Sequence, residues 1–440
     1  MRPFRIRDPI HGFIELSPQE RRAIDARCFQ RLRGIKQLAM TYLVYPGTQH
    51  TRFEHSLGVC DLATRIAREV EIGEEDQRVV RAAALLHDVG HGPFSHVSEN
   101  VLDDRNGLSG VHEAISVALI RSDEQLRKAL GAELCDRAAQ LLDDGGRGFR
   151  SVMSDIVSGP TDADKLDYLQ RDSYYAGVSY GKYDLDRLID TATIIQAGGG
   201  ETYLGFEDGG VWAVEGLLLA RHHMHRQVYG HKTRIATDIM IERALSLGLR
   251  EGALDEVAYE VASKDGRPQP DERFLKAYME QTDEHVMHRL LAQTSATSSR
   301  DLAERLLRRH LLRRNARVAL HERRDELGIR LSAVLNLDKP RLAELEESIA
   351  KHISHPPHLV ALYIEQPSNP TYRLPGAEIN AKDIMLAYKD RMPDYFQRES
   401  EIFRESSGGE KSFASLYFPK DDRIDEKKAE ELLWSALKNI

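Results

Sequence analysis

Residues 79–96 read VVRAAALLHDVGHGPFSH, and this stretch decides how the rest of the chain is interpreted. Apolar side chains run almost without interruption from Val79 to Leu86, and the polar pair His87–Asp88 and then Gly90 follow. A glycine just after an apolar run is typical of a helix end. The pattern therefore predicts a core helix with a polar tip, where a buried charge is costly unless it is paired or bound to a metal ion.

A second amphipathic helix is predicted upstream, starting near His55. Apolar residues recur after it at spacings of three and four, which places them on one helical face, namely Val59, Leu62, Ile66 and Val70. His55 heads this buried stripe.

Two imidazoles and two carboxylates form a candidate metal site: His55, His87, Asp88 and Asp164. Nitrogen and oxygen ligands without thiolate suit iron, manganese, magnesium or nickel better than structural zinc. Four protein ligands leave two positions of a six-coordinate ion for a water and a substrate phosphate oxygen. Taken alone, each of these residues could instead be a hydrogen-bonded core residue or a helix cap. This alternative explains the adjacent His87–Asp88 pair less well.

More histidines follow this pair, at His91, His96 and His112. Imidazoles can exchange protons near neutral pH, so these residues are candidates for acid–base catalysis. Glu99 lies three residues after His96 and can share its helical face, where it would orient the ring. A supporting structural role for these histidines is the alternative.

The composition is that of a folded protein. The chain has 440 residues, 41% of them hydrophobic, and 61 basic against 70 acidic side chains give a net charge of −9, which argues against nonspecific coating of nucleic acid. Three scattered cysteines do not form a disulfide framework. No stretch approaches the ~18 apolar residues of a membrane span, and the N-terminus lacks an apolar signal. We expect a cytoplasmic protein without a membrane segment.

The fold class expected is mostly α, with a helical core over residues 1–340 and a small α+β lobe over residues 341–440. Nine arginines and three acids with interspersed leucines predict an amphipathic basic helix over residues 300–324. Thr202, Leu204 and Phe206 alternate before Asp208–Gly210, which predicts a short hairpin that leads into another helix. Strands are also predicted at residues 359–364 and 412–418, with a polar stretch around Gly408–Gly409 between them.

Six segments in order carry a resemblance to a known family: DPIHGFIEL (8–16), FQRLRGIKQL (29–38), RFEHSLGV (52–59), LLHDVGHGPFSH (85–96), TDADKLDYLQRD (161–172) and HRQVYGHK (225–232). They resemble the HD-domain deoxynucleoside triphosphate triphosphohydrolases, in the branch of the SAM-and-HD-domain enzymes, over about residues 5–240. A His–Asp dipeptide alone is a weak signal, whereas six ordered motifs are specific.

The resemblance implies roles for individual residues. The metal ligands would be His55, His87, Asp88 and Asp164. His91, His96 and His112 would act at the α-phosphate, with Glu99 in place of the aspartate of the vertebrate enzyme. Triphosphate contacts are implied for Arg52, Lys165, Arg221, His225 and Tyr229, and sugar contacts for Gln37, Leu38, Tyr168 and Asp172. Positions that read a guanine nucleotide activator correspond to Asp25, Gln30 and Arg33, although Phe4–Arg5 departs from the activated pattern.

Spacing supports part of this assignment independently. Asp164, Tyr168 and either Arg171 or Asp172 recur at helical spacing and can share one face. Another helix is predicted to present Arg221, His225, Tyr229 and Lys232, with an apolar face formed by Ala220, Met224 and Val228. Arginine and lysine together suit a triphosphate, although solvated charges on an ordinary amphipathic face are the alternative.

We therefore expect metal-dependent hydrolysis of a deoxynucleoside triphosphate (dNTP) to a deoxynucleoside and inorganic triphosphate. A guanine nucleotide activator and a homo-oligomer, from dimer to tetramer, are implied by the resemblance. Two other interpretations stay open. One is a phosphodiesterase or nuclease that acts on nucleic-acid ends and uses the basic helix as a phosphate track. The other is a non-catalytic nucleotide-sensing assembly protein or nucleic-acid-binding regulator.

Overall fold

The computed structural model describes residues 4–146, 151–196, 201–328, 330–365, 383–403, 411–438 and 440. Contacts between residues divide the chain into two compact units. The first comprises Met1–Val228, Leu254–His288 and Leu374–Arg404, and the second comprises Tyr229–Ala253, Arg289–Arg373 and Glu405–Ile440. The mostly α fold predicted from the sequence is confirmed.

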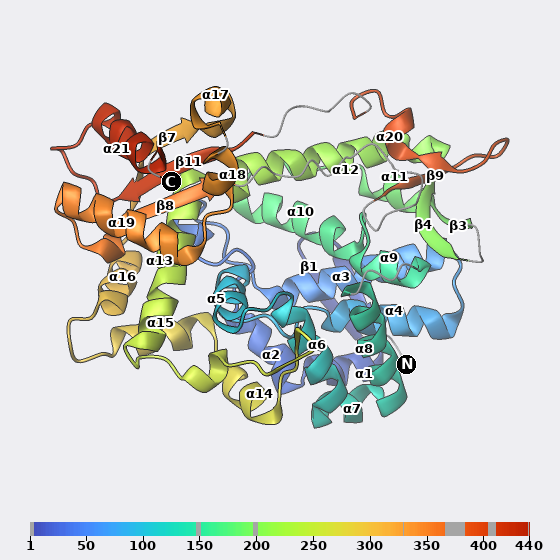
Figure 1. Ribbon diagram of the computed structural model, residues 1–440. Helices are drawn as coiled ribbons and strands as arrows, with labels where there is room; N and C mark the ends of the chain where they lie inside the picture. Colours follow the sequence, from blue (N-terminus) through green and yellow to red (C-terminus); the bar gives the residue numbers. More distant parts are fainter. Residues whose placement is uncertain are drawn as a thin grey trace. The chain divides into compact units, whose positions relative to one another are not determined.

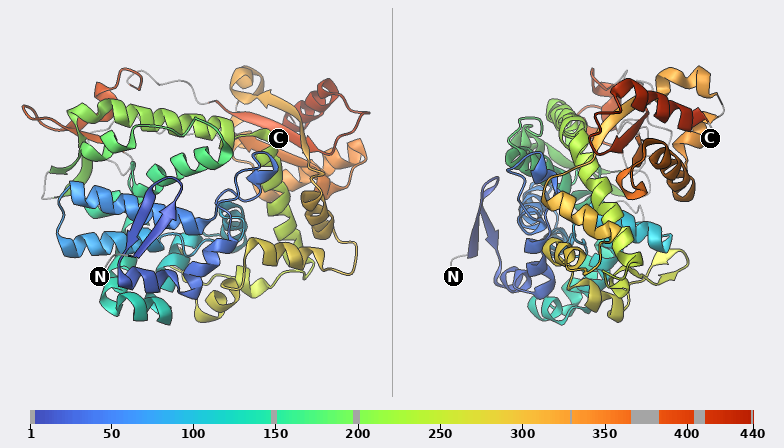
Figure 2. Two further views of the ribbon diagram at one scale, coloured as in Figure 1. Left: turned by 180° about the vertical axis from the view of Figure 1, so that it is seen from behind. Right: turned by 90° about the vertical axis from the view of Figure 1, so that its left-hand side faces the viewer.

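The first unit is built mainly of helices, which follow one another along the chain as α1 (Pro18–Ile24), α2 (Arg27–Gln30), α3 (Arg52–Glu69), α4 (Glu74–Leu86), α5 (His96–Asn106), α6 (Val111–Ser122), α7 (Glu124–Leu130), α8 (Ala132–Gly146), α9 (Val152–Ser158), α10 (Ala163–Ala176), α11 (Leu185–Asp190), α12 (Val211–Met224) and α14 (Glu272–Tyr278). Helix α15 (Asp283–Leu291) starts in this unit. An antiparallel hairpin of β1 (Phe4–Asp8) and β2 (Gly12–Leu16), dark blue in Figure 2, contacts α3.

Local sequence signals explain where the central helices begin and end. Thr51 and Glu54 form a capping box at the start of α3, and three acidic residues begin α4. Asp162 caps α10 by accepting a hydrogen bond from the Lys165 N–H. Helix α3 packs against both α4 and α10, so these signals fix the three helices that form the centre of the unit.

Gly58 permits the close approach of α3 and α10. A Cβ atom at this position would lie 1.9 Å from Oδ1 of Asp167 and 2.5 Å from Nη2 of Arg171. Because real Cβ atoms do not approach other atoms this closely, only glycine fits at the crossing.

A four-stranded sheet completes the first unit, in the order β10 (Asp394–Tyr395), β9 (Met385–Ala387), β4 (Thr202–Glu207) and β3 (Ala192–Gln196). The predicted alternation of Thr202, Leu204 and Phe206 lies in β4, which forms a hairpin with the preceding strand β3. Asp208–Gly210 is therefore not the turn of the hairpin but a 3₁₀ turn that leads into α12. Strand β9 pairs with β4 in parallel, and the short α20 (Phe396–Glu399) follows β10. These C-terminal residues therefore belong to the first unit, which differs from the 1–340 and 341–440 ranges predicted from the sequence.

The second unit contains a three-stranded antiparallel sheet in the order β7 (Arg313–Ala319), β11 (Phe413–Phe418) and β8 (Ala361–Glu365). Its helices are α13 (Lys232–Arg250), α16 (Ser298–Leu307), α17 (Arg324–Leu327), α18 (Arg330–Leu335), α19 (Lys339–Ile353) and α21 (Glu426–Lys438). Helices α19 and α21 pack against the sheet, and their buried side chains form one hydrophobic core with it (Figure 1). The strands predicted at 359–364 and 412–418 are present as β8 and β11, while Gly408–Gly409 lies outside the described residues.

The basic helix predicted over residues 300–324 is wrong beyond Leu307. Helix α16 ends there, Arg309 adopts a left-handed φ of 58°, and residues Arg313–Ala319 form β7. Ala316, Val318 and Leu320 are buried at alternate positions, while Leu307 is exposed. The period of two places apolar residues on the core face of a sheet, and this outweighs the helical spacing of the leucines.

No helix in the described ranges combines the length and the apolar character that crossing a membrane requires.

We predict that Ser354→Gly stabilises the protein by about 0.5 to 1 kcal/mol, because Ser354 ends α19 with a φ of 55° that glycine adopts without a steric penalty. The matched control is Ser348→Gly, at an exposed position inside the same helix, which should destabilise it by about 0.5 kcal/mol. Urea unfolding followed by circular dichroism measures both. Midpoints that shift in the same direction would contradict the proposed end of the helix.

Candidate functional site

The four predicted metal ligands lie around one point in the first unit. His55 is in the first turn of α3, His87 and Asp88 directly follow α4, and Asp164 is in the first turn of α10. The Nε2 atom of His55 lies 3.0 Å from Oδ1 of Asp164 and 3.6 Å from Oδ2 of Asp88. The Nε2 atom of His87 lies 3.3 Å from Oδ1 of Asp88 and 3.9 Å from Oδ1 of Asp164. Three helix ends thus bring together residues that are far apart in the sequence.

Both imidazoles are held by their other ring nitrogen. Nδ1 of His55 donates a hydrogen bond of 2.8 Å to Asp167, and Nδ1 of His87 donates one of 2.8 Å to the carbonyl of Ala84. Their Nε2 atoms are buried, and neither has a hydrogen-bond partner among the described residues. A buried, unsatisfied imidazole nitrogen beside carboxylate oxygens is what a bound divalent ion would satisfy, so the residues fit the implied metal.

Asp167 supports His55 and was not singled out in the sequence. Its carboxylate is fully buried and accepts hydrogen bonds from Nε and Nη2 of Arg171 at 2.7 and 2.9 Å and from Nε2 of His11 at 2.6 Å. Arg171 also donates to Asp8, at 2.8 Å. Burial opposes ionisation, but Arg171, His11 and His55 hold the pKa of Asp167 well below its ordinary value. The available signal was the spacing of Asp164, Asp167 and Arg171 along one helical face.

Opposite charges lie close together around the candidate metal site. Nη1 of Arg52 donates to Oδ2 of Asp88 at 2.5 Å, and despite burial Arg52 and the neighbouring histidines keep the pKa of Asp88 well below its ordinary value. Burial alone would lower the pKa of His55, but Asp164 and Asp167 raise it to about 10. These carboxylates therefore stabilise positive charge at this point, whether it is a proton or a metal ion.

The predicted acid–base residues lie next to the candidate metal site. Nε2 of His91 lies 3.3 Å from Oδ1 of Asp88, and the ring of His91 stacks on that of His112 with centroids 4.1 Å apart. Glu99 accepts a hydrogen bond of 2.9 Å from Nδ1 of His96 and another from Nδ1 of His112. Despite burial, the two histidines hold the pKa of Glu99 below its ordinary value. The side chain of His96 is 65% exposed, whereas His91 is buried, so His96 is the most accessible of the three rings.

Several predicted substrate-binding residues contact one another. Nη1 of Arg221 donates a hydrogen bond of 2.6 Å to the Tyr168 hydroxyl. Asp172 accepts one of 2.8 Å from Nε2 of His50, a buried histidine that the sequence did not single out. The backbone N–H of Gln37 donates to the carbonyl of His50 at 3.1 Å, so Gln37 and Asp172 are held by the same residue.

Lys165 lies one residue after Asp164 in α10. Its Nζ donates to the carbonyl of Gly159 at 3.0 Å and to Asp162 at 2.5 Å. Leu38 is partly buried next to Gln37. Both residues are therefore close in sequence to groups that form the site.

Unsatisfied polar atoms are concentrated at this site. Within the described ranges, six buried atoms without a hydrogen-bond partner come from the residues just described, namely Gln37 Oε1, His50 Nδ1, Arg52 Nη2, His55 Nε2, His87 Nε2 and His91 Nδ1. Because buried polar groups are nearly always satisfied in folded proteins, such a concentration indicates a place where a polar ligand binds.

The predicted continuous helix with Arg221, His225, Tyr229 and Lys232 on one face is wrong. Helix α12 ends at Met224, a π-helical turn spans His225–Tyr229, and α13 starts at Lys232. His231 caps α13 by accepting a hydrogen bond from the Thr233 N–H, which fixes the break. Arg221 and His225 belong to the first unit and Tyr229 and Lys232 to the second. The apolar face is buried as predicted, at Ala220, Met224 and Val228.

The three predicted activator residues are partly engaged within the first unit. Nε of Arg33 donates a hydrogen bond of 2.9 Å to Gln30, and its guanidinium lies 3.5 Å from the ring centroid of Phe53. Gln30 also donates to the carbonyl of Ile24, while Asp25 is exposed.

We predict that Asp164→Ala lowers metal affinity by more than the roughly 10- to 100-fold typical of removing an outer hydrogen-bond partner of a metal ligand. The change removes both a ligand and a negative charge from the site. Metal content after dialysis against limiting Mn²⁺, measured by mass spectrometry, tests this. Asp186→Ala, which removes a carboxylate that is 82% exposed, is the control. Equal metal content in the two variants would remove Asp164 from the ligand set.

Comparisons with known proteins agree with this geometry. Residues 52–171 match the HD domain, and residues 183–265 match the HD associated region. The uncharacterized protein MJ1154 of Methanocaldococcus jannaschii is 39% identical over 257 residues, which cover 57% of this chain and 51% of the relative. Deoxynucleoside triphosphate triphosphohydrolase SAMHD1 of Gallus gallus is 36% identical over 272 residues, which cover 54% of this chain and 44% of the relative.

The chain spans about half the length of the curated relatives it matches. A solved structure of a phosphohydrolase from Bacteroides thetaiotaomicron is similar over nearly the whole chain, with a TM-score of 0.71, 25% identity, and coverage of 96% of this chain and 100% of the other. Its fold and the two matched regions confirm the resemblance seen in the sequence: the chain contains an HD domain followed by an HD associated region and is related to the SAMHD1 triphosphohydrolases.

Proposed function

We propose that this protein is a hydrolase that cleaves dNTPs at the α-phosphorus and releases a deoxynucleoside and inorganic triphosphate. The observation that carries the proposal is the pair His96 and His112, bridged by Glu99, next to the His55–His87–Asp88–Asp164 cluster. This arrangement places proton-exchanging groups beside a candidate metal site. The names of the SAMHD1 relatives and of the Bacteroides phosphohydrolase support the same class of reaction.

The four clustered residues would hold a divalent ion, and manganese, iron, magnesium and nickel all suit their nitrogen and oxygen donors. When bound, such an ion would polarise a phosphate oxygen and lower the pKa of a water molecule. Asp167 keeps the Nδ1 proton of His55 in place, which leaves Nε2 as the ligand atom. The Ala84 carbonyl does the same for His87.

In the proposed reaction a water oxygen bonds to the α-phosphorus, the bond between that phosphorus and the 5′-oxygen breaks, and the 5′-oxygen takes up a proton. His96 is the proposed proton donor or the partner of the in-line attack, since Glu99 holds its Nδ1 and leaves Nε2 to face a substrate. His91 and His112 would bind the α-phosphate. Glu99 reaches both rings, so the longer side chain here serves the role given to aspartate in the vertebrate enzyme.

The remaining predicted residues would bind the rest of the nucleotide. Arg52, Lys165, Arg221 and His225 of the first unit are proposed to bind the triphosphate, whose charge suits guanidinium and ammonium donors. Tyr229, which the resemblance also implies, is the first residue of the second unit. Gln37, Tyr168 and Asp172 would contact the sugar. Leu38 would fill the space of a 2′-hydroxyl and so disfavour ribonucleotides.

We predict that the purified protein with Mn²⁺ converts dATP to deoxyadenosine and inorganic triphosphate. Glu99→Gln should lower kcat by roughly 100-fold or more, because it removes the carboxylate charge that accepts hydrogen bonds from both imidazole rings. Chromatography and phosphorus NMR identify the products. Release of nucleoside monophosphate with pyrophosphate would contradict cleavage at the α-phosphorus as proposed. Cleavage of DNA ends without dNTP turnover would favour a nuclease instead.

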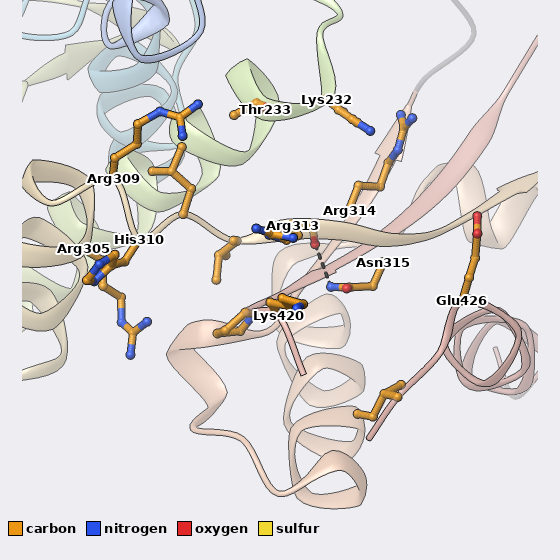
Figure 3. A pocket seen from close by; sticks show the side chains of 14 residues that line it. Lys232, Thr233, Arg305, Arg309, His310, Arg313, Arg314, Asn315, Lys420 and Glu426 are labelled. Atoms are coloured by element: carbon orange, nitrogen blue, oxygen red, sulfur yellow. Dashed lines mark hydrogen bonds between the residues drawn. The ribbon is translucent and has the colours of Figure 1, made fainter. Parts of the chain in front are cut away.

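We further propose that an anionic nucleotide regulates the protein and favours a homo-oligomer. Asp25, Gln30 and Arg33 are the positions implied by the resemblance. The second unit also contains a pocket of about 770 Å³ with basic side chains from several elements around it (Figure 3), namely Lys232, Arg305, Arg309, Arg313, Arg314 and Lys420. Among the described residues that line it, Glu426 is the one acid. Such a concentration of positive charge is suited to a polyphosphate.

The cysteines in the described residues are unpaired and buried, which is compatible with the reducing cytoplasm, where we propose that the protein works.

We predict that GTP or dGTP accelerates dATP hydrolysis and raises the molar mass in light scattering. Arg33→Ala and the double change Arg313→Ala with Arg314→Ala should each reduce this response, because each removes positive charge that would bind the activator. The measurement compares rate and mass with and without nucleotide. If neither nucleotide changes either quantity in the wild-type protein, activation does not operate and Arg33 has only its local contacts with Gln30 and Phe53.

A further inference from the structure

Asp283 connects two parts of the site from a distant point in the chain. It is the first residue of α15, and its carboxylate is buried, with 5% of the residue exposed. Oδ2 accepts a hydrogen bond of 3.0 Å from the backbone N–H of Lys36, and Oδ1 accepts one of 2.7 Å from the backbone N–H of Phe94. Lys36 directly precedes Gln37 and Leu38, and Phe94 lies two residues before His96.

The two residues directly before His96 have an uncommon backbone conformation. Phe94 and Ser95 have φ angles of 60° and 55°, in a region that residues other than glycine rarely adopt. Helix α5 begins immediately afterwards, with His96 as its first residue. Such a conformation persists only where the surrounding structure holds it, and the hydrogen bond from the Phe94 N–H to Asp283 is part of that support.

Ser95 makes a second connection between the same two segments. Its hydroxyl donates a hydrogen bond of 2.7 Å to the Lys36 carbonyl and accepts one of 2.8 Å from Nε of Arg52. The N–H of Lys36 is thus bonded to Asp283, and its carbonyl is bonded to Ser95 in the turn. The segment with Gln37 and Leu38 and the turn that presents His96 are therefore fixed to each other.

Residues just before Asp283 hold the rest of the loop that leads to this turn. The Tyr278 hydroxyl donates a hydrogen bond of 3.0 Å to the Gly90 carbonyl. Arg31 bridges the carbonyls of His91 and Gln281, at 2.8 and 2.9 Å. A Cβ atom at Gly92 would lie 2.6 Å from the Tyr278 hydroxyl, so the loop and this segment are in close contact.

We propose that Asp283 is a positioning residue that fixes the position of His96 relative to the Gln37–Leu38 segment. One carboxylate holds both backbones, so its loss displaces the proposed proton donor relative to the proposed sugar-binding residues. A displacement of about 1 Å can reduce turnover on the order of 100-fold. The activity readouts rest on the proposed hydrolysis. The two hydrogen bonds that Asp283 accepts from the N–H groups of Lys36 and Phe94, here called the clamp, can be measured without it.

The ionisation of Asp283 gives the clamp a pH dependence. Burial raises the pKa of Asp283 to about 6, while the N–H groups of Lys36 and Phe94 and the charges of Lys36 and Arg31 oppose the rise. Tyr42 is a further titratable group that faces it. Above pH 6 the carboxylate accepts from both N–H groups. Below pH 6 one oxygen carries a proton and faces an N–H donor, so one of the two hydrogen bonds is lost.

Amide hydrogen exchange of the wild-type protein tests the clamp directly. After correction for intrinsic rates, protection of peptides that contain Lys36 and Phe94 should fall at least several-fold between pH 7 and pH 5. In Asp283→Asn, whose amide can accept only one of the two N–H groups, protection of one peptide should be low at both values. Protection of both peptides in Asp283→Asn that equals the wild-type protection at pH 7 overturns the proposal. Low protection of both peptides in the wild type at pH 7 overturns it as well, whether or not the variant folds.

Steady-state kinetics supply the second test. Asp283→Asn should lower kcat for dATP at least 10-fold, keep KM within about 3-fold and retain the wild-type metal content. The matched control is Asp155→Asn, since Asp155 is equally buried and accepts a hydrogen bond from the Leu204 N–H at 3.1 Å. This control should keep the wild-type kcat.

Equal loss of kcat in the two variants, or none in Asp283→Asn, overturns the positioning role. Absence of dNTP turnover in the wild type overturns the proposed function instead, and hydrogen exchange then still decides whether the clamp exists.

Discussion

The carboxylate of Asp167 is the group on which the architecture of the first unit depends. It is fully buried where α3 and α10 cross, and it accepts hydrogen bonds from His55, His11 and Arg171. Removing one partner of such a buried charged group leaves the others uncompensated, which typically costs about 3 to 5 kcal/mol. The same contacts fix the orientation of His55, so folding of the unit and assembly of the candidate metal site require one set of interactions.

Some residues of the candidate site are held by contacts close to them in the sequence, and others by contacts from distant segments. The candidate ligands are placed by helix ends that their own neighbours define, such as the Thr51–Glu54 capping box and the Asp162 cap. The register of the loop after His87 depends instead on a segment almost two hundred residues later, through Tyr278 and Asp283. The helix ends that carry the candidate metal ligands are therefore defined by nearby residues, whereas the geometry around His96 depends on contacts that are distant in the sequence.

This division also explains what could be predicted from the sequence. The helix that ends at His87–Asp88 and the helix that starts near His55 could both be predicted, because helical periodicity and a polar tip are local patterns. Asp167 had a weak local signal, since it shares a helical face with Asp164 and Arg171. Asp283 and His50 had none, because their partners lie far away in the sequence. The arginine-rich segment was misread because leucines at helical spacing masked the alternation of Ala316, Val318 and Leu320.

The parallel pairing of β9 with β4 has a practical consequence for work with shortened forms of the protein. Phe206 and Glu207 pair with Leu386 and Ala387, and Met385 and Tyr395 pack with Ile195 and Tyr203. A fragment that stops before β9 would leave one edge of β4 open and expose apolar side chains on that sheet. Open edges of this kind recruit strands from other molecules and lead to aggregation. A fragment that stops before residue 383 also lacks β11, the middle strand of the second unit's sheet, and α21, so each unit would lose part of its apolar packing.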